Sequence, residues 1–355
     1  MYTVLAVIVV LGVLIFFHEL GHFLMARLVG VRVLKFSLGF GPKLVGFKRG
    51  HTEYILSAIP LGGYVKLLGE NPGERLSPEE IPYSFSHRPL RDKALIVLAG
   101  PLANFVLAWF FFVLVFVFQG KPVYLPEVGK VLPDSPAAQA GLKPGDLIVA
   151  VNGQPISSWQ ELNALIKKSA GRPLKLTIKR GQEKLVVTVT PQLREVKNIF
   201  GETIKTPLIG IMSAGKARFV KTDPVKALAE AFLMVLAMIK LTVVSVIKLV
   251  ERVLPLSTLG GPIFIAKLAG EQAQAGLWPL VSFMAVLSVN LGVLNLLPIP
   301  MLDGGHLFLY AIEGLRGKPI PEKTKEFVMK LGLALLIVLM IVVFYNDILR
   351  LLGKS

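Results

Sequence analysis

Three residues at helical spacing, His18, Glu19 and His22, form the part of this sequence best suited to chemistry. On a helix the two histidines lie about 40° apart, and Glu19 falls within the same arc of roughly 100°. Two imidazoles one turn apart can hold one zinc ion, and the adjacent carboxylate can take a proton from the attacking water. The alternative is a polar stripe that joins packed membrane helices, with the histidines hydrogen-bonded to neighbours.

The surroundings of these residues favour the zinc interpretation. No charged side chain occurs from Met1 to Phe17, and ionisable groups in an apolar span are costly enough to indicate function. The chain of 355 residues is 53% hydrophobic and only 17% charged, against about 25% charged in soluble domains, which indicates an integral membrane protein. Cysteine is absent, so any metal must be held by His, Asp or Glu. The first segment lacks the marks of a cleaved signal peptide, and we expect it to be retained.

The net charge of +16 does not indicate a nucleic-acid partner. The basic residues are spread over loops beside apolar stretches, a distribution typical of anionic lipid headgroups and of topology signals. The lipid bilayer is therefore the expected partner of this charge.

Four stretches are long and apolar enough to cross a membrane, which takes about 20 residues. A fifth, 227–250, carries Lys226, Glu230, Lys240, Lys248 and Glu251 within about 40° of one line on a helix, and this narrow charged stripe favours a helix lying in the membrane interface over a fifth span. A fifth span would place the two halves of the site on opposite sides. The four predicted spans are 4–28, 94–118, 277–302 and 327–349.

Orientation follows from the loop charges. The loop from Ala26 to Lys93 holds eleven Lys and Arg residues, whereas the first seventeen residues hold none, so the positive-inside rule places this loop in the cytoplasm. The long region after the second span is then extracytoplasmic. We expect a multi-pass protein of the bacterial cell (inner) membrane, with the site toward the cytoplasmic side.

The extracytoplasmic region contains a small domain of mixed helices and strands. Turn residues at Asn152-Gly153, a capping box at Ser158 and alternating apolar residues on both sides of Gly181 predict turns, a helix and a hairpin. Their order, with the GLKPGD…VNG signature, resembles a bacterial-type PDZ domain. Such domains bind an extended peptide or a chain end by adding a strand.

A second part of the site is predicted at the end of the third apolar span. Pro298 and Pro300 must break the helix there, and a lone carboxylate, Asp303, follows at the same membrane depth as His18 and His22. A zinc protease needs a third ligand and an open position, which favours Asp303 as that ligand. The alternatives are that Asp303 only caps the next helix, or that His306 is the ligand.

The motifs FHELGHF, LDGGH and GPLANF, with a PDZ insertion between the second and third spans, resemble the site-2 protease family of intramembrane zinc metalloproteases, and most closely its regulator of sigma-E protease group. The resemblance implies zinc (Zn²⁺) ligands His18, His22 and Asp303, Glu19 as catalytic base, and a substrate-contacting role for Asn295. It also implies a membrane-associated β-loop at Leu61-Gly62-Gly63-Tyr64-Val65-Lys66. We expect Gly63, Tyr64, Val65 and Lys66 to hold an extended substrate as an edge strand. An ordinary cytoplasmic hairpin is the alternative for this loop.

The fold class predicted is an α-helical polytopic membrane protein with four transmembrane helices, an inserted α+β PDZ domain and a membrane-associated β-loop. Its parts are a first membrane half (1–118), the PDZ domain (119–200), a linker with the interfacial helix (201–276) and a second membrane half (277–355).

The predicted function is intramembrane zinc proteolysis. The resemblance implies substrates that span the membrane once and have already been trimmed by another protease, such as anti-sigma factors or remnant signal peptides. A non-enzymatic scaffold and a metal transporter are the alternatives, but the polar residues cluster at one depth and form no path across the membrane.

Overall fold

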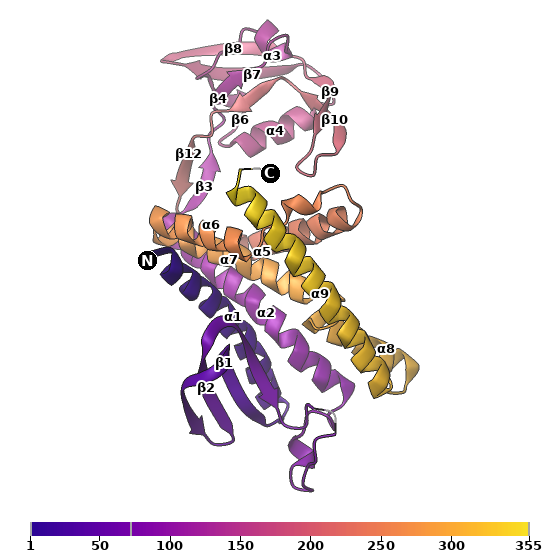
Figure 1. The fold of residues 1–355 in the computed structure, drawn as a ribbon. Helices are drawn as coiled ribbons and strands as arrows, with labels where there is room; N and C mark the ends of the chain where they lie inside the picture. Colours follow the sequence, from indigo (N-terminus) through magenta and orange to yellow (C-terminus); the bar gives the residue numbers. More distant parts are fainter. Residues whose placement is uncertain (1, 72, 354–355) are drawn as a thin grey trace. The chain divides into compact units, whose positions relative to one another are not determined.

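The computed structural model describes residues 2–71 and 73–353, which fall into two units by their contacts. The membrane unit comprises Met1–Val115, Val225–Ile247 and Pro255–Ser355. The inserted unit comprises Phe116–Pro224 together with Lys248–Leu254. Figure 1 labels the elements of both units in chain order.

The membrane unit is built mainly of helices, as its apolar sequence requires, because a helix satisfies its own backbone polar groups in lipid. Two single 3-10 turns, Ile81–Tyr83 and Leu256–Thr258, lie in its connections, and a π-helical turn, Val115–Gln119, extends α2. Its helices are α1 (Tyr2–Leu28), α2 (Leu90–Leu114), α5 (Pro224–Val250), α6 (Pro262–Ala275), α7 (Leu277–Asn295), α8 (Asp303–Arg316) and α9 (Glu322–Leu351).

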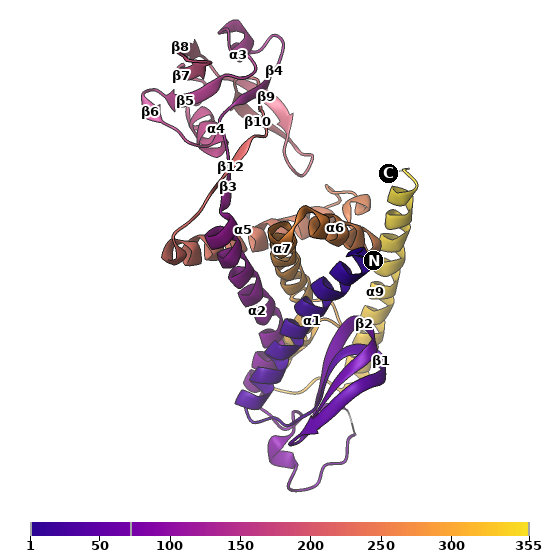
Figure 2. The same ribbon diagram turned by 90° about the vertical axis from the view of Figure 1, so that its left-hand side faces the viewer.

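Within the described residues, five helices are long and apolar enough to cross a membrane: α1, α2 with its extension, α5, α7 and α9. The sequence predicted four, and the count differs because α5 is an unbroken helix of 27 residues whose few charges leave a sufficient apolar stretch. Figure 2 draws α5 running across the direction of α2. Trp109 Nε1 donates to the Leu228 carbonyl (2.9 Å), and Thr242 Oγ1 donates to Asn290 Oδ1 (2.8 Å), so α5 contacts both α2 and α7.

Helix α2 packs between α1 and α7, and glycines allow the close approach. A Cβ at Gly21 would collide with the Ala99 carbonyl, and one at Gly292 would lie 2.6 Å from the Phe105 ring. Small residues at helix contacts are typical of membrane bundles, where close packing replaces the hydrophobic driving force. This packing fixes the positions of α1, α2 and α7 relative to one another, and all three carry residues of the site.

A long, bent hairpin follows α1. It consists of β1 (Val33–Arg49) and β2 (Thr52–Leu67), and residues 33–38 pair both with 53–56 and with 63–67. Gly39 adopts φ +92°, a left-handed conformation that favours glycine, where the chain turns between these pairings. Phe36 packs against Phe16 and Phe23 of α1, so the hairpin is fixed to the helix that carries the two histidines.

The inserted unit contains a four-stranded antiparallel sheet in the order β6-β5-β7-β8. Its core includes Ile148, Leu162, Leu176 and Ile178, the apolar residues that alternate in sequence or line the helix face, and each is fully buried. The sheet strands are β5 (Leu147–Val151), β6 (Gln154–Pro155), β7 (Leu174–Arg180) and β8 (Glu183–Val189), with helices α3 (Pro136–Gln139) and α4 (Trp159–Lys168).

The capping box predicted at the start of α4 is present in modified form. Ser158 Oγ accepts a hydrogen bond from the Glu161 amide (3.2 Å), while the Glu161 carboxylate accepts from the Ser157 amide (2.8 Å) rather than from Ser158. The first contact satisfies an amide that the helix leaves unpaired, and the second fixes the residue before the N-cap. The predicted helix start is thus confirmed.

Three two-stranded ribbons complete the inserted unit. The outermost ribbon joins β3 (Lys121–Tyr124) to β12 (Ala217–Val220), so the chain enters and leaves the unit along paired antiparallel strands. The other strands are β4 (Val128–Val131) paired with β11 (Ile211–Ser213), and β9 (Gln192–Lys197) paired with β10 (Thr203–Leu208). Strands β10, β11 and β12, which pair within the inserted unit, therefore lie beyond residue 200, the predicted end of the PDZ domain.

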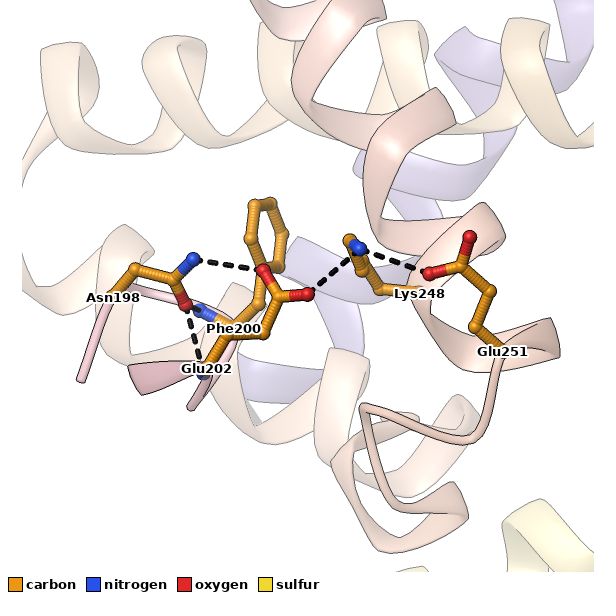
Figure 3. Close-up of polar contacts among 5 residues, drawn as sticks. All are labelled: Asn198, Phe200, Glu202, Lys248 and Glu251. Atoms are coloured by element: carbon orange, nitrogen blue, oxygen red, sulfur yellow. Dashed lines mark hydrogen bonds and ion pairs between the residues drawn. The ribbon is translucent and has the colours of Figure 1, made fainter. Parts of the chain in front are cut away.

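The turn between β9 and β10 contacts the segment Lys248–Leu254, which belongs to the same inserted unit. Figure 3 shows Lys248 between two carboxylates, with its Nζ 2.8 Å from Glu202 Oε1 and 2.9 Å from Glu251 Oε2. Asn198 Nδ2 donates to the other Glu202 oxygen (2.9 Å). The Lys248 and Asn198 hydrogen bonds lower the pKa of Glu202 and keep it ionised at neutral pH.

Candidate metal centre and active site

The two histidines of α1 lie side by side, as their spacing predicts. Their ring centroids are 4.8 Å apart and nearly perpendicular, and the two Nε2 atoms are 3.3 Å apart. Both side chains are mostly buried, with exposed fractions of 12% for His18 and 14% for His22. Two ring nitrogens therefore point at one position inside the membrane unit.

Asp303 reaches that position from the opposite end of the sequence. Its Oδ2 lies 3.3 Å from His18 Nε2 and its Oδ1 lies 3.6 Å from His22 Nε2. The break before α8 makes this possible: Met301 adopts φ +80°, and Gly304 and Gly305 lie directly on the carbonyls of residues 296, 297 and 299. Leu302, not Asp303, is the N-cap of α8, so the capping alternative does not describe the Asp303 carboxylate.

The three donors fit one zinc ion. Tetrahedral zinc with ligands at 2.0–2.1 Å holds its donor atoms about 3.3–3.4 Å apart, close to the observed 3.3 and 3.6 Å. Among the described residues, Asp303 Oδ2 is buried and has no hydrogen-bond partner. Although burial raises the pKa of Asp303, the neighbouring imidazoles of His18 and His22 outweigh it and bring the pKa to about 2, so the carboxylate is ionised as a ligand must be.

His306 is not part of this group. The three residues whose donor atoms lie within 4.8 Å of one another are His18, His22 and Asp303. His306 lies one turn after Asp303 on α8, with its ring 6.5 Å from that of Tyr310, and burial lowers the pKa of its imidazole.

Glu19 lies beside the three donors, on the wall of a cavity of about 820 Å³ that also includes His22 and Asp303. Its Cγ is 2.9 Å from the place that a Cβ on Gly63 would occupy, so β2 passes immediately next to the carboxylate. The carboxylate is thus close to the metal-ligand position without being one of the three donors.

The cavity extends from the donors to a polar region between β2, α2, α8 and α9. Glu70 faces it, accepting a hydrogen bond from the Leu67 amide (3.0 Å), and burial raises the pKa of its carboxyl. At the α9 side Lys325 pairs with the buried Glu313 (2.6 Å). A cavity of this size, with polar side chains along part of its wall, gives water a place to reach the donors.

The predicted substrate-contacting residues lie close to the site. Asn295 Nδ2 is 3.4 Å from His18 Nε2 at the end of α7. Val65 lines the cavity together with Glu19, while the Tyr64 ring stacks on Phe40 (6.4 Å between centroids). The backbone of Lys66 in β2 pairs with that of Lys35 in β1. Among the described residues, 63–67 pair on one side only, with 33–38, which leaves this strand at an edge of the hairpin sheet.

Sequence reasoning missed the contribution of α2. His22 Nδ1 is 2.8 Å from the Ile96 carbonyl, and His18 Nδ1 is 3.1 Å from Asn104 Nδ2. A Cβ on Gly100 would collide with the His22 ring. The GPLANF segment contains Gly100 and Asn104, but nothing in one sequence indicates which face of this helix meets the histidines.

Comparison with known proteins agrees with this geometry. The family model of Peptidase family M50 matches residues 6–339, and the chain belongs to this family, the site-2 protease family. It is 38% identical to the putative zinc metalloprotease Atu1380 of Agrobacterium fabrum, covering 98% of this chain and 95% of that one. It is 34% identical to the zinc metalloprotease RasP of Geobacillus kaustophilus, covering 98% and 97%.

The inserted segment is similar to solved PDZ domains, including that of the SdrC-like protein Lmo2051 of Listeria monocytogenes (28% identity over 27% of this chain and 90% of that one, TM-score 0.20). The protein is a zinc metalloprotease with several membrane helices and an inserted unit of mixed strands and helices.

Proposed function

We propose that this protein is an intramembrane endopeptidase, which hydrolyses peptide bonds within or near the transmembrane segment of proteins that span the membrane once. The observation that carries the proposal is the convergence of His18, His22 and Asp303, with Glu19 alongside, on helices long and apolar enough to cross a bilayer. A metalloprotease site at such a depth is suited to substrates that are themselves in the membrane.

In this proposal His18, His22 and Asp303 hold the zinc ion, which when bound polarises the scissile carbonyl and lowers the pKa of water. Glu19 accepts the proton of the attacking water and passes it to the leaving amine. The Asn295 amide, 3.4 Å from His18 Nε2, is placed to donate a hydrogen bond to the substrate carbonyl as negative charge develops on its oxygen.

A helical substrate hides its carbonyls in hydrogen bonds and must be extended before attack. The unpaired edge of residues 63–67 offers backbone groups to which an extended substrate can add as a strand. Gly63 supports this role because its missing side chain leaves room between the strand and Glu19. We propose that Gly63, Tyr64, Val65 and Lys66 hold the substrate by their backbone.

We also propose that α5 lies in the membrane interface. Helix α5 begins beside the end of α2, at the Trp109 contact, and α6 lies at the N-terminal end of α1, where Gly270 packs on Thr3. The C-terminal end of α2 and the N-terminal end of α1 are the ends that lie away from His18 and His22. If α5 crossed the bilayer, the chain would have to cross back through α6, whose 14 residues span about 21 Å, less than the bilayer core of about 30 Å.

We propose that the protein lies in a bacterial cell membrane; with α5 in the interface, the loop charges favour a site toward the cytoplasm and a PDZ domain outside. A PDZ domain in that position is suited to bind a peptide or chain end. We propose that substrates are trimmed outside by another protease first, because trimming creates such an end.

The test compares cleavage of a single-span substrate and zinc content in the purified protein. Glu19→Gln should retain zinc while cleavage falls by at least about 10²-fold, the usual contribution of a general base. Glu271→Gln, an exposed carboxylate on α6, is the matched control and should cleave normally. Undiminished cleavage by Glu19→Gln would refute the proposed base, and a wild-type protein that binds zinc but cleaves no membrane substrate would favour a scaffold.

A further inference from the structure

Helix α2 presents one face to the two histidines of α1. Ile96, Gly100 and Asn104 follow one another at intervals of four residues, so they line one side of the helix. Ile96 and Gly100 contact His22, and Asn104 contacts His18. The order is reversed along α1 because the two helices are antiparallel.

Asn104 is completely buried at this position. Its Nδ2 is 3.1 Å from His18 Nδ1, and its Oδ1 is one of the few buried polar atoms without a hydrogen-bond partner among the described residues. Its backbone carbonyl accepts a hydrogen bond from Ser288 Oγ of α7 (2.7 Å), which fixes this turn of α2. A buried unpaired amide oxygen is costly and calls for a partner.

The hydrogen bond at Nδ1 decides what Nε2 can do. A neutral imidazole carries one proton, so Nε2 can bind a metal only when the proton is on Nδ1, facing an acceptor. His22 meets this condition because the Ile96 carbonyl can only accept. For His18 the facing group is an amide, which accepts if its Oδ1 rather than its Nδ2 lies against the ring. Rotating the amide by 180° makes that exchange and gives the unpaired Oδ1 its donor.

We infer that Asn104 is a positioning residue for the metal centre, whose Oδ1 accepts the Nδ1 proton of His18 and so directs the Nε2 lone pair toward zinc. This inference rests on the proposed role of His18 as a zinc ligand. An amide performs the task without charge, whereas a carboxylate here would add a negative group to Glu19 and Asp303 in a buried region. Partners of this kind orient metal-binding histidines, and their loss typically lowers metal affinity 10–100-fold.

The test measures zinc affinity of the full-length protein in detergent, by competition with a chromophoric chelator. Asn104→Leu, which keeps the size but removes the acceptor, should weaken zinc binding by about 10–100-fold. Asn104→Asp keeps an acceptor oxygen and should bind zinc much more tightly than Asn104→Leu. Circular dichroism of each variant without zinc identifies any that fails to fold.

A second measurement reports the tautomer directly. In ¹⁵N-histidine spectra of the zinc-loaded wild type, the His18 signal, assigned by its absence in His18→Ala, should show a protonated Nδ1. A zinc-loaded protein with the His18 proton on Nε2 would overturn the inference, as would wild-type zinc affinity in a folded Asn104→Leu.

The His18→Ala variant separates the two proposals. If His18→Ala binds zinc as tightly as the wild type, the proposed ligand set itself fails. If His18→Ala loses zinc but Asn104→Leu and Asn104→Asp both bind it normally, only the role of Asn104 fails.

Discussion

Gly100 of α2 lies against the imidazole of His22, so closely that a Cβ on Gly100 would collide with Nε2. A helix interior normally prefers alanine to glycine by about 1 kcal/mol. The absence of a side chain here therefore has a structural reason, which is the space that the ring occupies.

Gly100→Ala should displace the His22 ring and lower zinc affinity, although alanine favours the helix. We expect at least a tenfold loss, comparable to the loss of a hydrogen-bonding partner of a metal ligand. Gly12→Ala on α1 is the control, because a Cβ there meets nothing within 4 Å. Zinc titration of both variants checks the prediction, and equal affinities would contradict it.

Asp303→Asn should reduce both zinc content and proteolysis, because the amide is a weaker ligand than the ionised carboxylate. Metal analysis after dialysis against a chelator measures the loss. Asp134→Asn, an exposed residue of the inserted unit, should retain zinc under the same dialysis. An Asp303→Asn protein with a full complement of zinc would count against the carboxylate as a ligand.

Gly63→Val should abolish cleavage while leaving zinc bound. The added side chain would begin 2.9 Å from Glu19 Cγ and 2.8 Å from the Ser37 carbonyl, so either the strand or the Glu19 carboxylate must move. Neither is one of the three metal donors. Cleavage assays and zinc content measured on the same preparation check the result, and normal cleavage would show that β2 tolerates displacement beside Glu19.

The inserted unit should lose stability in acid. Asp146 is fully buried, and although burial raises its pKa, hydrogen bonds from Arg180 (2.7 and 2.8 Å) and from the Lys143 amide lower the pKa below its usual value. Because the folded-state pKa is depressed, this contribution is present above the unfolded pKa of about 3.9 and is lost as the pH falls through the folded value.

Hydrogen exchange of the β5 amides in the intact protein, corrected for the intrinsic rate, measures this loss. Asp146→Asn should destabilise the unit by about 3 kcal/mol at neutral pH, because Arg180 loses its charged partner. It should also remove the acid dependence below pH 4. If the Asp146→Asn variant lost stability in acid as the wild type does, the acid dependence would come from other carboxylates.

Local geometry made part of the site predictable. The positions of His18 and His22 follow from helical spacing, and Asp303 is marked by the prolines and glycines that end α7. Asn104 lies 86 residues from His18, and its role depends on the register between α1 and α2. That register is set by small residues such as Gly21, whose partners a single sequence does not reveal.

In the fold, too, features set by local sequence patterns were predictable, whereas features set by long-range contacts were not. The apolar stretches, the PDZ signature and the turn at Gly181 follow from local patterns, and each is present. The number of membrane-length helices was predicted as four rather than five, because a charged stripe and an apolar length coexist in α5. The pairing of β12 with β3 joins residues about a hundred positions apart and is invisible to local reasoning.

The pairing of β3 with β12 brings the two ends of the inserted unit together. Since Lys121–Tyr124 and Ala217–Val220 run side by side, the two ends of everything between them are held within one strand spacing. A module with adjacent ends can be lengthened, shortened or exchanged without pulling on the helices that flank it. The inserted unit can therefore diversify while the helices that carry His18, His22 and Asp303 stay unchanged.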